Sequence, residues 1–270
     1  MLKTRVITGG ILGALLLAIL FLLPPLWTVL AWGLIFVIGG WEWAGFGGLR
    51  MPAARAAYTA AIAALLFAAW QWTGQRSNLL TLFGLAVAWW GVAFLWLAIA
   101  PARHKPWLTL LCGVPVLVPA FVALGRLQTS VDGFARGPLI VLWLATMVCA
   151  ADVGAFSAGR SFGRRKLAPR VSPGKTWEGA AGGAAAVALV AWGGALHFDL
   201  PVPAMVAFSL CIATVSVIGD LTESMFKRAA ALKDSGGILP GHGGMLDRLD
   251  SVTAAAPLYA LGLFGSGVIR

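Results

Sequence analysis

The sequence predicts an all-α polytopic integral membrane protein with about nine transmembrane helices and a cytoplasmic N-terminus. Hydrophobic residues make up 60% of the 270 residues and charged residues only 11%, whereas a soluble domain carries about a quarter charged residues. Apolar runs close to the roughly 20 residues that a bilayer requires recur along the chain. The Lys and Arg residues lie mainly between alternate runs.

The apolar runs are expected to form one integral domain, residues 1–270. Lys3 and Arg5 precede the first run, as in a signal peptide, but no small-residue cleavage site follows it. Pro24-Pro25 leads directly into the next run, so we expect a retained anchor. The expected spans are approximately 6–23, 26–43, 57–73, 79–99, 107–125, 138–158, 178–197, 202–219 and 252–269.

The distribution of basic residues predicts the orientation. Cytoplasmic loops carry an excess of Lys and Arg, and a cytoplasmic N-terminus places sixteen of the twenty on that side. In a membrane protein such loops contact anionic lipids, so the net charge of +10 does not lead us to expect a nucleic-acid partner. The four on the opposite side are Arg76, Arg126, Arg136 and Arg270.

The two halves of the chain differ in polar chemistry. The N-terminal helices, 1–137, have short loops, and their one unusual feature is Trp41-Glu42-Trp43. That pattern favours an aromatic belt at the membrane interface with one exposed acid. The C-terminal half, 138–270, contains two long cytoplasmic segments, 159–177 and 220–251. We therefore expect the chemistry in the second half.

Asp152 lies within the sixth expected span. An ionisable residue in a membrane helix usually faces a cavity or a partner; alternatively, this one lies in wet surroundings at the cytoplasmic end. Ala155 and Gly159, four residues apart, predict close helix packing.

The stretch from Ser172 to Thr176 resembles a phosphate-binding turn. Gly174 would free backbone N–H groups, while Ser172, Lys175 and Thr176 would donate hydrogen bonds. The stretch lacks the full Walker spacing and follows no expected strand, so a P-loop ATPase is not favoured. Thr176 could equally be the N-cap of the seventh helix.

Segment 220–251 interleaves acids, bases and glycines. Clustered carboxylates need a cation, and Mg²⁺ prefers one or two carboxylates together with phosphate oxygens. If the eighth helix continues past the membrane, one face carries Asp220, Glu223, Ser224 and Lys227. Asp247 and Asp250 would share a face at the start of the ninth helix.

Glycines flank the charged residues of this segment. Gly236-Gly237 and Gly241-His242-Gly243-Gly244 allow positive φ angles and close backbone approach, as phosphate-binding loops require. His242 is a candidate phosphate contact, or else a residue that only bonds within its loop. The alternative for the whole segment is a flexible loop with surface salt bridges.

The motif residues resemble the signature of the bacterial phosphatidate cytidylyltransferases, also called CDP-diglyceride synthetases. They read Ser224-x₂-Lys227-Arg228-x₄-Lys233-Asp234 and Pro240-Gly241-His242-Gly243-Gly244-x₂-Asp247-Arg248-x-Asp250. The early Trp41-Glu42-Trp43 and the stretch from Asp152 to Trp177 are also similar to the bacterial members. The resemblance is strong over the last 120 residues or so and loose before them.

This resemblance implies that CTP and phosphatidate are converted to CDP-diacylglycerol and pyrophosphate, the first step towards anionic and zwitterionic phospholipids. It implies a requirement for Mg²⁺ and leaves a second cation open. It also implies a homodimer in the bacterial inner membrane, with membrane lipids around it and the active site facing the cytoplasm.

We assign roles to the motif residues as hypotheses. The expected metal ligands are Asp220, Asp247 and Asp250, with Asp234 a weaker candidate. The bases expected to bind the triphosphate or the lipid phosphate are Lys227, Arg228, Lys233 and Arg248. The expected substrate contacts are Ser172, Lys175, Thr176, Ser224, Asp234, His242, Gly243 and Gly244.

Three other functions remain as alternatives. A CDP-alcohol phosphatidyltransferase would have Gly after its first Asp-x₂-Asp, whereas Ser251 follows Asp250 here. A CTP-dependent lipid kinase would transfer the γ- rather than the α-phosphorus. An ion-coupled transporter would use Asp152 and Asp220 near the bilayer midplane, usually within paired repeats, and no repeat is evident.

Overall fold

The computed structural model describes residues 2–99, 105–130 and 137–269, with side chains from residue 7 onward. Within these ranges the chain forms nine α-helices, a two-stranded hairpin and a 3₁₀ turn. In order they are α1 (Leu2–Phe21), α2 (Pro25–Phe46), α3 (Pro52–Trp72), α4 (Arg76–Ile99), α5 (Pro106–Thr129), α6 (Gly137–Phe162), β1 (Lys166–Ala168), β2 (Ser172–Thr176), α7 (Trp177–His197), α8 (Val202–Ala229), η1 (Leu246–Arg248) and α9 (Asp250–Ser266).

The expected helical, polytopic class is confirmed. In the described part of the chain, the seven helices α2 to α8 are long and apolar enough to cross a membrane. The apolar part of α1, Ile7–Phe21, and the 17-residue α9 are shorter. Each expected apolar run coincides with a helix, while the full count of nine crossings stays a prediction.

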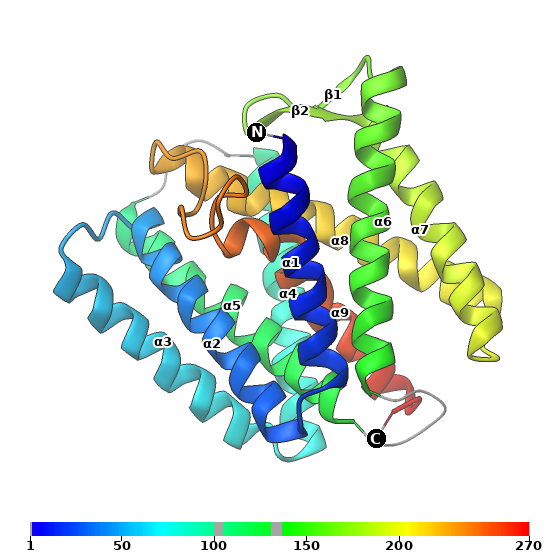
Figure 1. Ribbon diagram of the computed structural model, residues 1–270, viewed down its shortest axis with the longest axis horizontal. Helices are drawn as coiled ribbons and strands as arrows, with labels where there is room; N and C mark the ends of the chain where they lie inside the picture. The colour runs from blue at the N-terminus through cyan, green and yellow to red at the C-terminus, as the bar shows by residue number, and fades with distance from the viewer. Residues whose placement is uncertain (1, 100–104, 131–136, 270) are drawn as a thin grey trace.

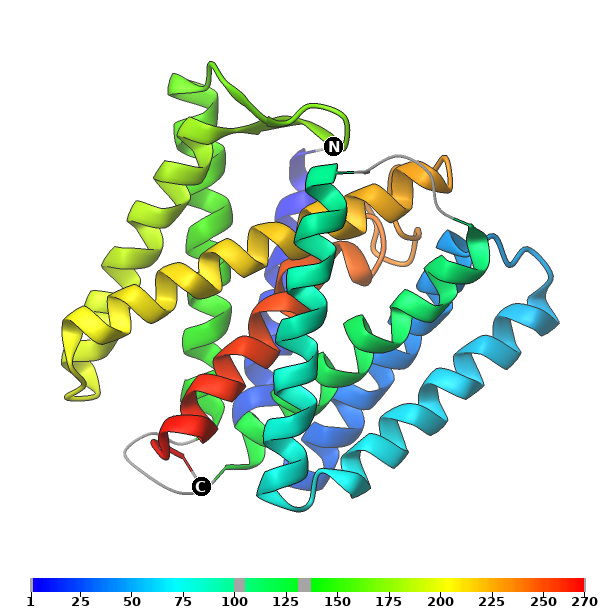
Figure 2. The ribbon, with the colours of Figure 1, turned by 180° about the vertical axis from the view of Figure 1, so that it is seen from behind.

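Successive helices run in alternating directions. The beginning of α1 and the end of α9 lie at opposite ends of the molecule (Figures 1 and 2). The β1–β2 hairpin and the segment between α8 and α9 lie at the end where α1 begins. The two long polar segments of the C-terminal half therefore meet at one end of the bundle.

The interior is built around α5 and α9. On α9, buried side chains follow one another from Thr253 to Pro257. The outer helix α3, by contrast, buries only Ile62 and Leu66. Large apolar side chains are exposed on the outer helices, for example Leu85 on α4 and Phe67 on α3, as expected where lipid replaces water as the solvent.

Helices α6 and α7 pack backbone to backbone through small residues. A Cβ added to Gly182 would lie 2.2 Å from the Cβ of Ala158. A Cβ on Gly183 would lie 3.4 Å from that of Ala155. The predicted packing face on α6 is thereby confirmed, and Gly at position 182 is required by the close approach.

The stretch Ser172–Thr176 is a strand, so its prediction as a turn was wrong. It pairs antiparallel with β1, placing Lys166 opposite Thr176, and the chain reverses at residues 169–171. Pro173 and Gly174 are tolerated because a two-stranded hairpin consists only of edge strands. The N-cap alternative for Thr176 is confirmed, since its Oγ1 accepts a hydrogen bond from the Gly179 N–H at 3.1 Å.

Candidate active site

Helix α8 carries the first set of polar residues into the site. It continues beyond residue 219 to Ala229, which confirms that Asp220, Glu223, Ser224 and Lys227 share one face. Glu223 and Lys227 are buried, whereas Asp220 and Ser224 are half-buried. The Ser224 hydroxyl donates to Asp220 Oδ1 at 3.3 Å.

The hairpin brings a basic residue to this face. Lys175 on β2 donates its ammonium to Asp220 Oδ2, and the two side chains form an ion pair. Each is about one-quarter exposed, 27% for Lys175 and 24% for Asp220. The two polar segments, 159–177 and 220–251, therefore contribute to one site.

A cavity of about 1070 Å³ opens beside this ion pair. Its walls are mainly apolar side chains from α4, α6, α7 and α8, such as Phe94, Phe156 and Val217. The polar lining residues include Asp152, Ser172, Lys175, Thr176, Asp220 and Ser251. Asp152 lines this cavity, as expected, and is itself exposed, which also agrees with the alternative of wet surroundings. The walls of the space are mainly apolar, with a few charged residues among them.

Lys227 lies between two acids. Its ammonium donates to Asp247 Oδ1 at 2.6 Å and contacts Glu223 Oε1 at 3.1 Å. These side chains are at most 9% exposed. Asp250 lies close enough to interact electrostatically with Lys227 and Glu223. One buried cation thus neutralises part of a carboxylate cluster.

Asp247 closes the loop that precedes α9. Its Oδ2 accepts hydrogen bonds from the Ser235 N–H at 2.9 Å and the Gly244 N–H at 2.8 Å. Burial acts to raise the pKa of Asp247, but the hydrogen bonds from Lys227, Gly244 and Ser235 together hold the pKa below its usual range. The carboxylate therefore stays ionised at neutral pH.

Asp247 and Asp250 do not both lie in the ninth helix, so the expectation that they share a face at its start was wrong. Helix α9 begins only at Asp250, while Asp247 belongs to the separate turn η1. The turn stands apart because Leu249, between them, has φ of −114° and ψ of −8°, outside ideal α-helical geometry.

The remaining basic candidates lie at the exposed side of the loop. Arg248 is exposed and donates to the His242 carbonyl at 3.1 Å. Arg228 is exposed, with one long bond of 3.4 Å to the Leu232 carbonyl. Lys233 and Asp234 are exposed as well. These groups are accessible to a ligand from water.

The glycines have the predicted geometry at several positions. Gly241 and Gly243 have φ of +73° and +82°, which side-chain-bearing residues rarely adopt. A Cβ on Gly244 would lie 2.1 Å from Ser235 Oγ. His242 is half-buried, and its Nδ1 has no hydrogen-bond partner among the described residues.

Comparison with known proteins identifies the family. The model of the Cytidylyltransferase family matches residues 3–264. The phosphatidate cytidylyltransferase of Haemophilus influenzae is 39% identical over 285 residues, covering 96% of this chain and 98% of that protein. The one from Pseudomonas aeruginosa is 39% identical over 276 residues, covering 99% and 98%. The chain belongs to the phosphatidate cytidylyltransferase family. It is a nucleotidyltransferase of phospholipid biosynthesis that makes CDP-diacylglycerol.

The family implies a bound metal ion, and some of the carboxylates of the site are placed where they could bind one. Among the described residues, no three His, Cys, Asp or Glu form a group that could hold a metal ion. The expected set of Asp220, Asp247 and Asp250 is therefore not assembled. Asp220, however, faces the large cavity together with Asp152. Two carboxylates beside space for phosphate oxygens match the preference of Mg²⁺.

Glu42 was missed as a member of the site. Its side chain is 1% exposed, as is that of Trp43, whose Nε1 donates to the Thr109 carbonyl at 2.7 Å. The interpretation as an aromatic belt with an exposed acid was therefore wrong. Glu42 contacts the loop before α9, and an acid inside an apolar helix was the available signal.

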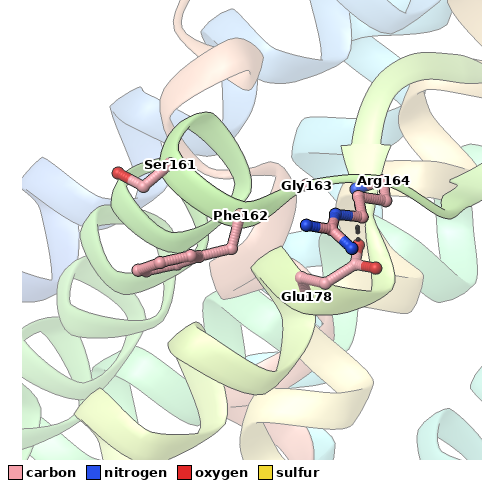
Figure 3. A pocket seen from close by; sticks show the side chains of 5 residues that line it. All are labelled: Ser161, Phe162, Gly163, Arg164 and Glu178. Atoms are coloured by element: carbon pink, nitrogen blue, oxygen red, sulfur yellow. Dashed lines mark hydrogen bonds between the residues drawn. The ribbon is translucent and has the colours of Figure 1, made fainter.

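A smaller cavity lies at the junction of α6 and α7 (Figure 3). It measures about 370 Å³ and is lined by Ser161, Phe162, Gly163, Arg164 and Glu178. The Glu178 carboxylate accepts a hydrogen bond from the Arg164 N–H at 3.0 Å and from the Arg165 N–H at 3.2 Å. These bonds hold the start of the hairpin against α7.

Proposed function

We propose that the enzyme transfers the cytidylyl group of CTP to phosphatidate, with release of pyrophosphate, at the cytoplasmic face of the bacterial inner membrane. The observation that carries this proposal is the large cavity, which has mainly apolar walls and charged groups at Asp152, Arg160, Lys175 and Asp220. A phosphatidate molecule has the same division, with two acyl chains and one anionic headgroup. The fit supports this reaction over ion transport.

The lipid would lie with its acyl chains against the apolar walls and its phosphate at Lys175. Lys175 pairs with Asp220, and it would exchange that partner for a phosphate oxygen. Ser172 and Thr176, which line the same cavity, are the proposed neutral hydrogen-bond donors.

The nucleotide would approach from water, where Arg228, Lys233 and Arg248 are exposed. Arg is suited to bidentate contact with phosphate. His242 and Gly243 lie in the loop before α9 and would supply further donors, with Asp234 next to Gly243. Gly244 would act by holding Asp247, to which its N–H already donates, and Ser224 on α8 is a further proposed donor. The buried Lys227 would act by holding Asp247 rather than by direct contact.

The reaction needs no strong general base. A phosphate monoester has a second pKa near 6, so the phosphatidate oxygen that attacks the α-phosphorus is largely ionised at neutral pH. The difficulty is to bring two anions together. Lys175 and the exposed bases would reduce that repulsion and align the reacting groups, which dominates phosphoryl-transfer catalysis.

Mg²⁺ would be held chiefly by Asp220, with Asp250 and Asp152, which both interact electrostatically with Asp220, as further carboxylates. When bound, it would neutralise phosphate charge at the reacting centre. Asp247 stays a candidate ligand only if Lys227 leaves its Oδ1, because both of its oxygens already accept hydrogen bonds. A second cation and a homodimer remain further parts of this proposal.

Purified protein incubated with CTP labelled at the α-phosphate, phosphatidate and Mg²⁺ tests the reaction. We expect label in the lipid fraction that depends on both substrates and on the metal. Label in lipid only from γ-labelled CTP would indicate a kinase. Substrate uptake into vesicles without CTP consumption would indicate a transporter. Asp220→Asn is expected to abolish the transfer while leaving membrane insertion intact.

A further inference from the structure

The buried carboxylate of Glu42 connects the N-terminal half of the chain to the loop before α9. Glu42 lies on α2, and its oxygens accept hydrogen bonds from that loop. Oε1 accepts from the Met245 N–H at 2.9 Å, and Oε2 accepts from the Leu246 N–H at 2.8 Å. The Ser235 hydroxyl donates to Oε2 at 2.9 Å. Three donors from two parts of one loop thus converge on one side chain.

No Lys or Arg forms an ion pair with Glu42 within the described ranges. A buried carboxylate is costly unless hydrogen bonds compensate it, and charge-assisted bonds are the strong ones. The loop N–H groups supply that compensation. The carboxylate in turn anchors the loop, because both of its oxygens accept hydrogen bonds from it, while Arg55 on α3 adds a longer-range attraction.

Two glycines show how closely the loop fits around this anchor. A Cβ on Gly236 would lie 2.6 Å from Glu42 Oε1, and a Cβ on Gly244 would lie 2.5 Å from the same atom. The backbone can reach the carboxylate only because both positions lack side chains. These glycines therefore serve the contact with Glu42 as well as the flexibility of the loop.

The anchor continues to the charged centre through Asp247. Ser235, which donates to Glu42, also contacts Asp247 Oδ2 through its hydroxyl at 3.0 Å and its N–H at 2.9 Å. Asp247 Oδ1 in turn accepts from Lys227 at 2.6 Å. A displacement of the loop at Glu42 would therefore move Asp247 and break its contact with Lys227 on α8.

We propose that Glu42 is a positioning residue for cytidylyl transfer: it anchors the loop of residues 235–246 on α2 and thereby holds Asp247 in contact with Lys227 beside the site. This inference rests on the roles proposed above for those two residues. Neither of them is among the described residues that line the large cavity. The effect of losing Glu42 is accordingly expected in kcat rather than in KM for phosphatidate.

Glu42→Gln tests the proposal at constant size. Each carboxylate oxygen faces a backbone N–H, so the amide NH₂ must oppose one of them. Loss of a residue that orients reactive groups typically costs about 10- to 100-fold in activity, and we expect a fall of that order in kcat per folded enzyme. Hydrogen exchange in the peptide containing Met245 and Leu246 should become faster.

The matched control is the reciprocal exchange Gln128→Glu. Gln128 is buried and donates to the Leu20 carbonyl at 2.8 Å, near the opposite end of the bundle from the loop. This variant should lower the Tm without lowering kcat per folded enzyme and without faster exchange in residues 235–249. A purely structural role for Glu42 would give the same pattern in Glu42→Gln and would overturn the proposal.

Ser235→Ala tests the same network if the Glu42→Gln variant does not fold. It removes one of the three donors and should lower kcat less than the loss of Glu42 does. In the double variant the two effects should not add, because both act through one loop. Wild-type kcat and exchange in Ser235→Ala, or additive effects, would overturn the inference. Asp247→Asn tests the underlying role separately: full activity there would overturn the inference and leave the proposed function standing, whereas loss of label transfer in the wild type would contradict the proposed function itself.

Discussion

Two lysines of the site have different surroundings, so replacing them is expected to have different effects. Lys175 is partly exposed at the edge of a cavity, with one acid beside it. Lys227 is buried between Glu223 and Asp247. An ion pair open to water can exchange its partner for a ligand at little cost, whereas removal of a buried cation leaves charges uncompensated.

Lys175→Gln should reduce turnover by about 100-fold or more, the usual effect of removing one donor that stabilises developing charge. The protein should remain folded, because the lost ion pair is partly exposed. Initial rates with labelled CTP at varied phosphatidate would measure the change. The control is Lys166→Gln on the paired strand, which is exposed and does not line the cavity. Equal activity of the two variants would refute the assignment.

Lys227→Met should destabilise the fold by about 3–5 kcal/mol, because it leaves a buried carboxylate pair without its cation. Thermal unfolding in detergent would show a large fall in Tm. Arg228→Met, one residue along the helix, removes an exposed base with a single long hydrogen bond. Its Tm should stay near that of the wild type, and an equal fall in both variants would contradict the burial argument.

Among the elements, the α6–α7 pair supports the β1–β2 hairpin in addition to its place among the candidate membrane spans. Asp152 lies on α6, Lys175 lies on β2, and α7 follows directly. The close backbone contact at Gly182 keeps these parts at fixed separation. A change in helix spacing should therefore alter the cavity.

Gly182→Ala and Gly193→Ala form a matched pair on α7. A Cβ at position 182 would lie 2.2 Å from Ala158 Cβ, whereas one at position 193 has no heavy atom within 4 Å. Alanine favours a helix over glycine by about 1 kcal/mol, so Gly193→Ala should be neutral or stabilising. Overpacking typically costs about 1–3 kcal/mol, so Gly182→Ala should lower both Tm and activity. Similar Tm values would show that the helices can move apart freely.

Local pattern predicted the helices and the shared face of α8, because both depend on residues within a few turns. It also indicated the Thr176 cap, whose partner is three residues away. The strand Ser172–Thr176 was not predicted, since Ser-Pro-Gly is typical of a turn and its pairing with β1 depends on the hairpin as a whole. Glu42 was misassigned because its partners, Met245 and Leu246, lie about two hundred residues away.

At the scale of the whole molecule, the arrangement of the helices predicts that all residues of the site face the same side of the membrane. The hairpin and the loop before α9 lie at the end where α1 begins (Figure 1). The basic residues concentrate in the same segments, and positive loops remain in the cytoplasm.

Cysteine labelling would check this topology. In a background in which Cys112, Cys149 and Cys211 are replaced, Arg170→Cys and Ile238→Cys should react with an impermeant thiol reagent only in inverted vesicles. Gln75→Cys, between α3 and α4 at the other end, should react only in right-side-out vesicles. All three positions are exposed. Labelling of positions 75 and 170 from the same side would exclude the proposed topology.

Helix α8 connects the cavity to the buried charged residues. With 28 residues at about 1.5 Å each, it is roughly 42 Å long, whereas the hydrocarbon core of a bilayer is about 30 Å thick. Its one continuous rod carries both the cavity wall at Val217 and the buried Lys227. The expected span, residues 202–219, is roughly 27 Å long at that rise and matches the core, so the last turns of α8, which carry Lys227, extend beyond it. One rigid helix therefore sets the distance between the lipid-facing cavity and the buried charges, with no flexible connection between them.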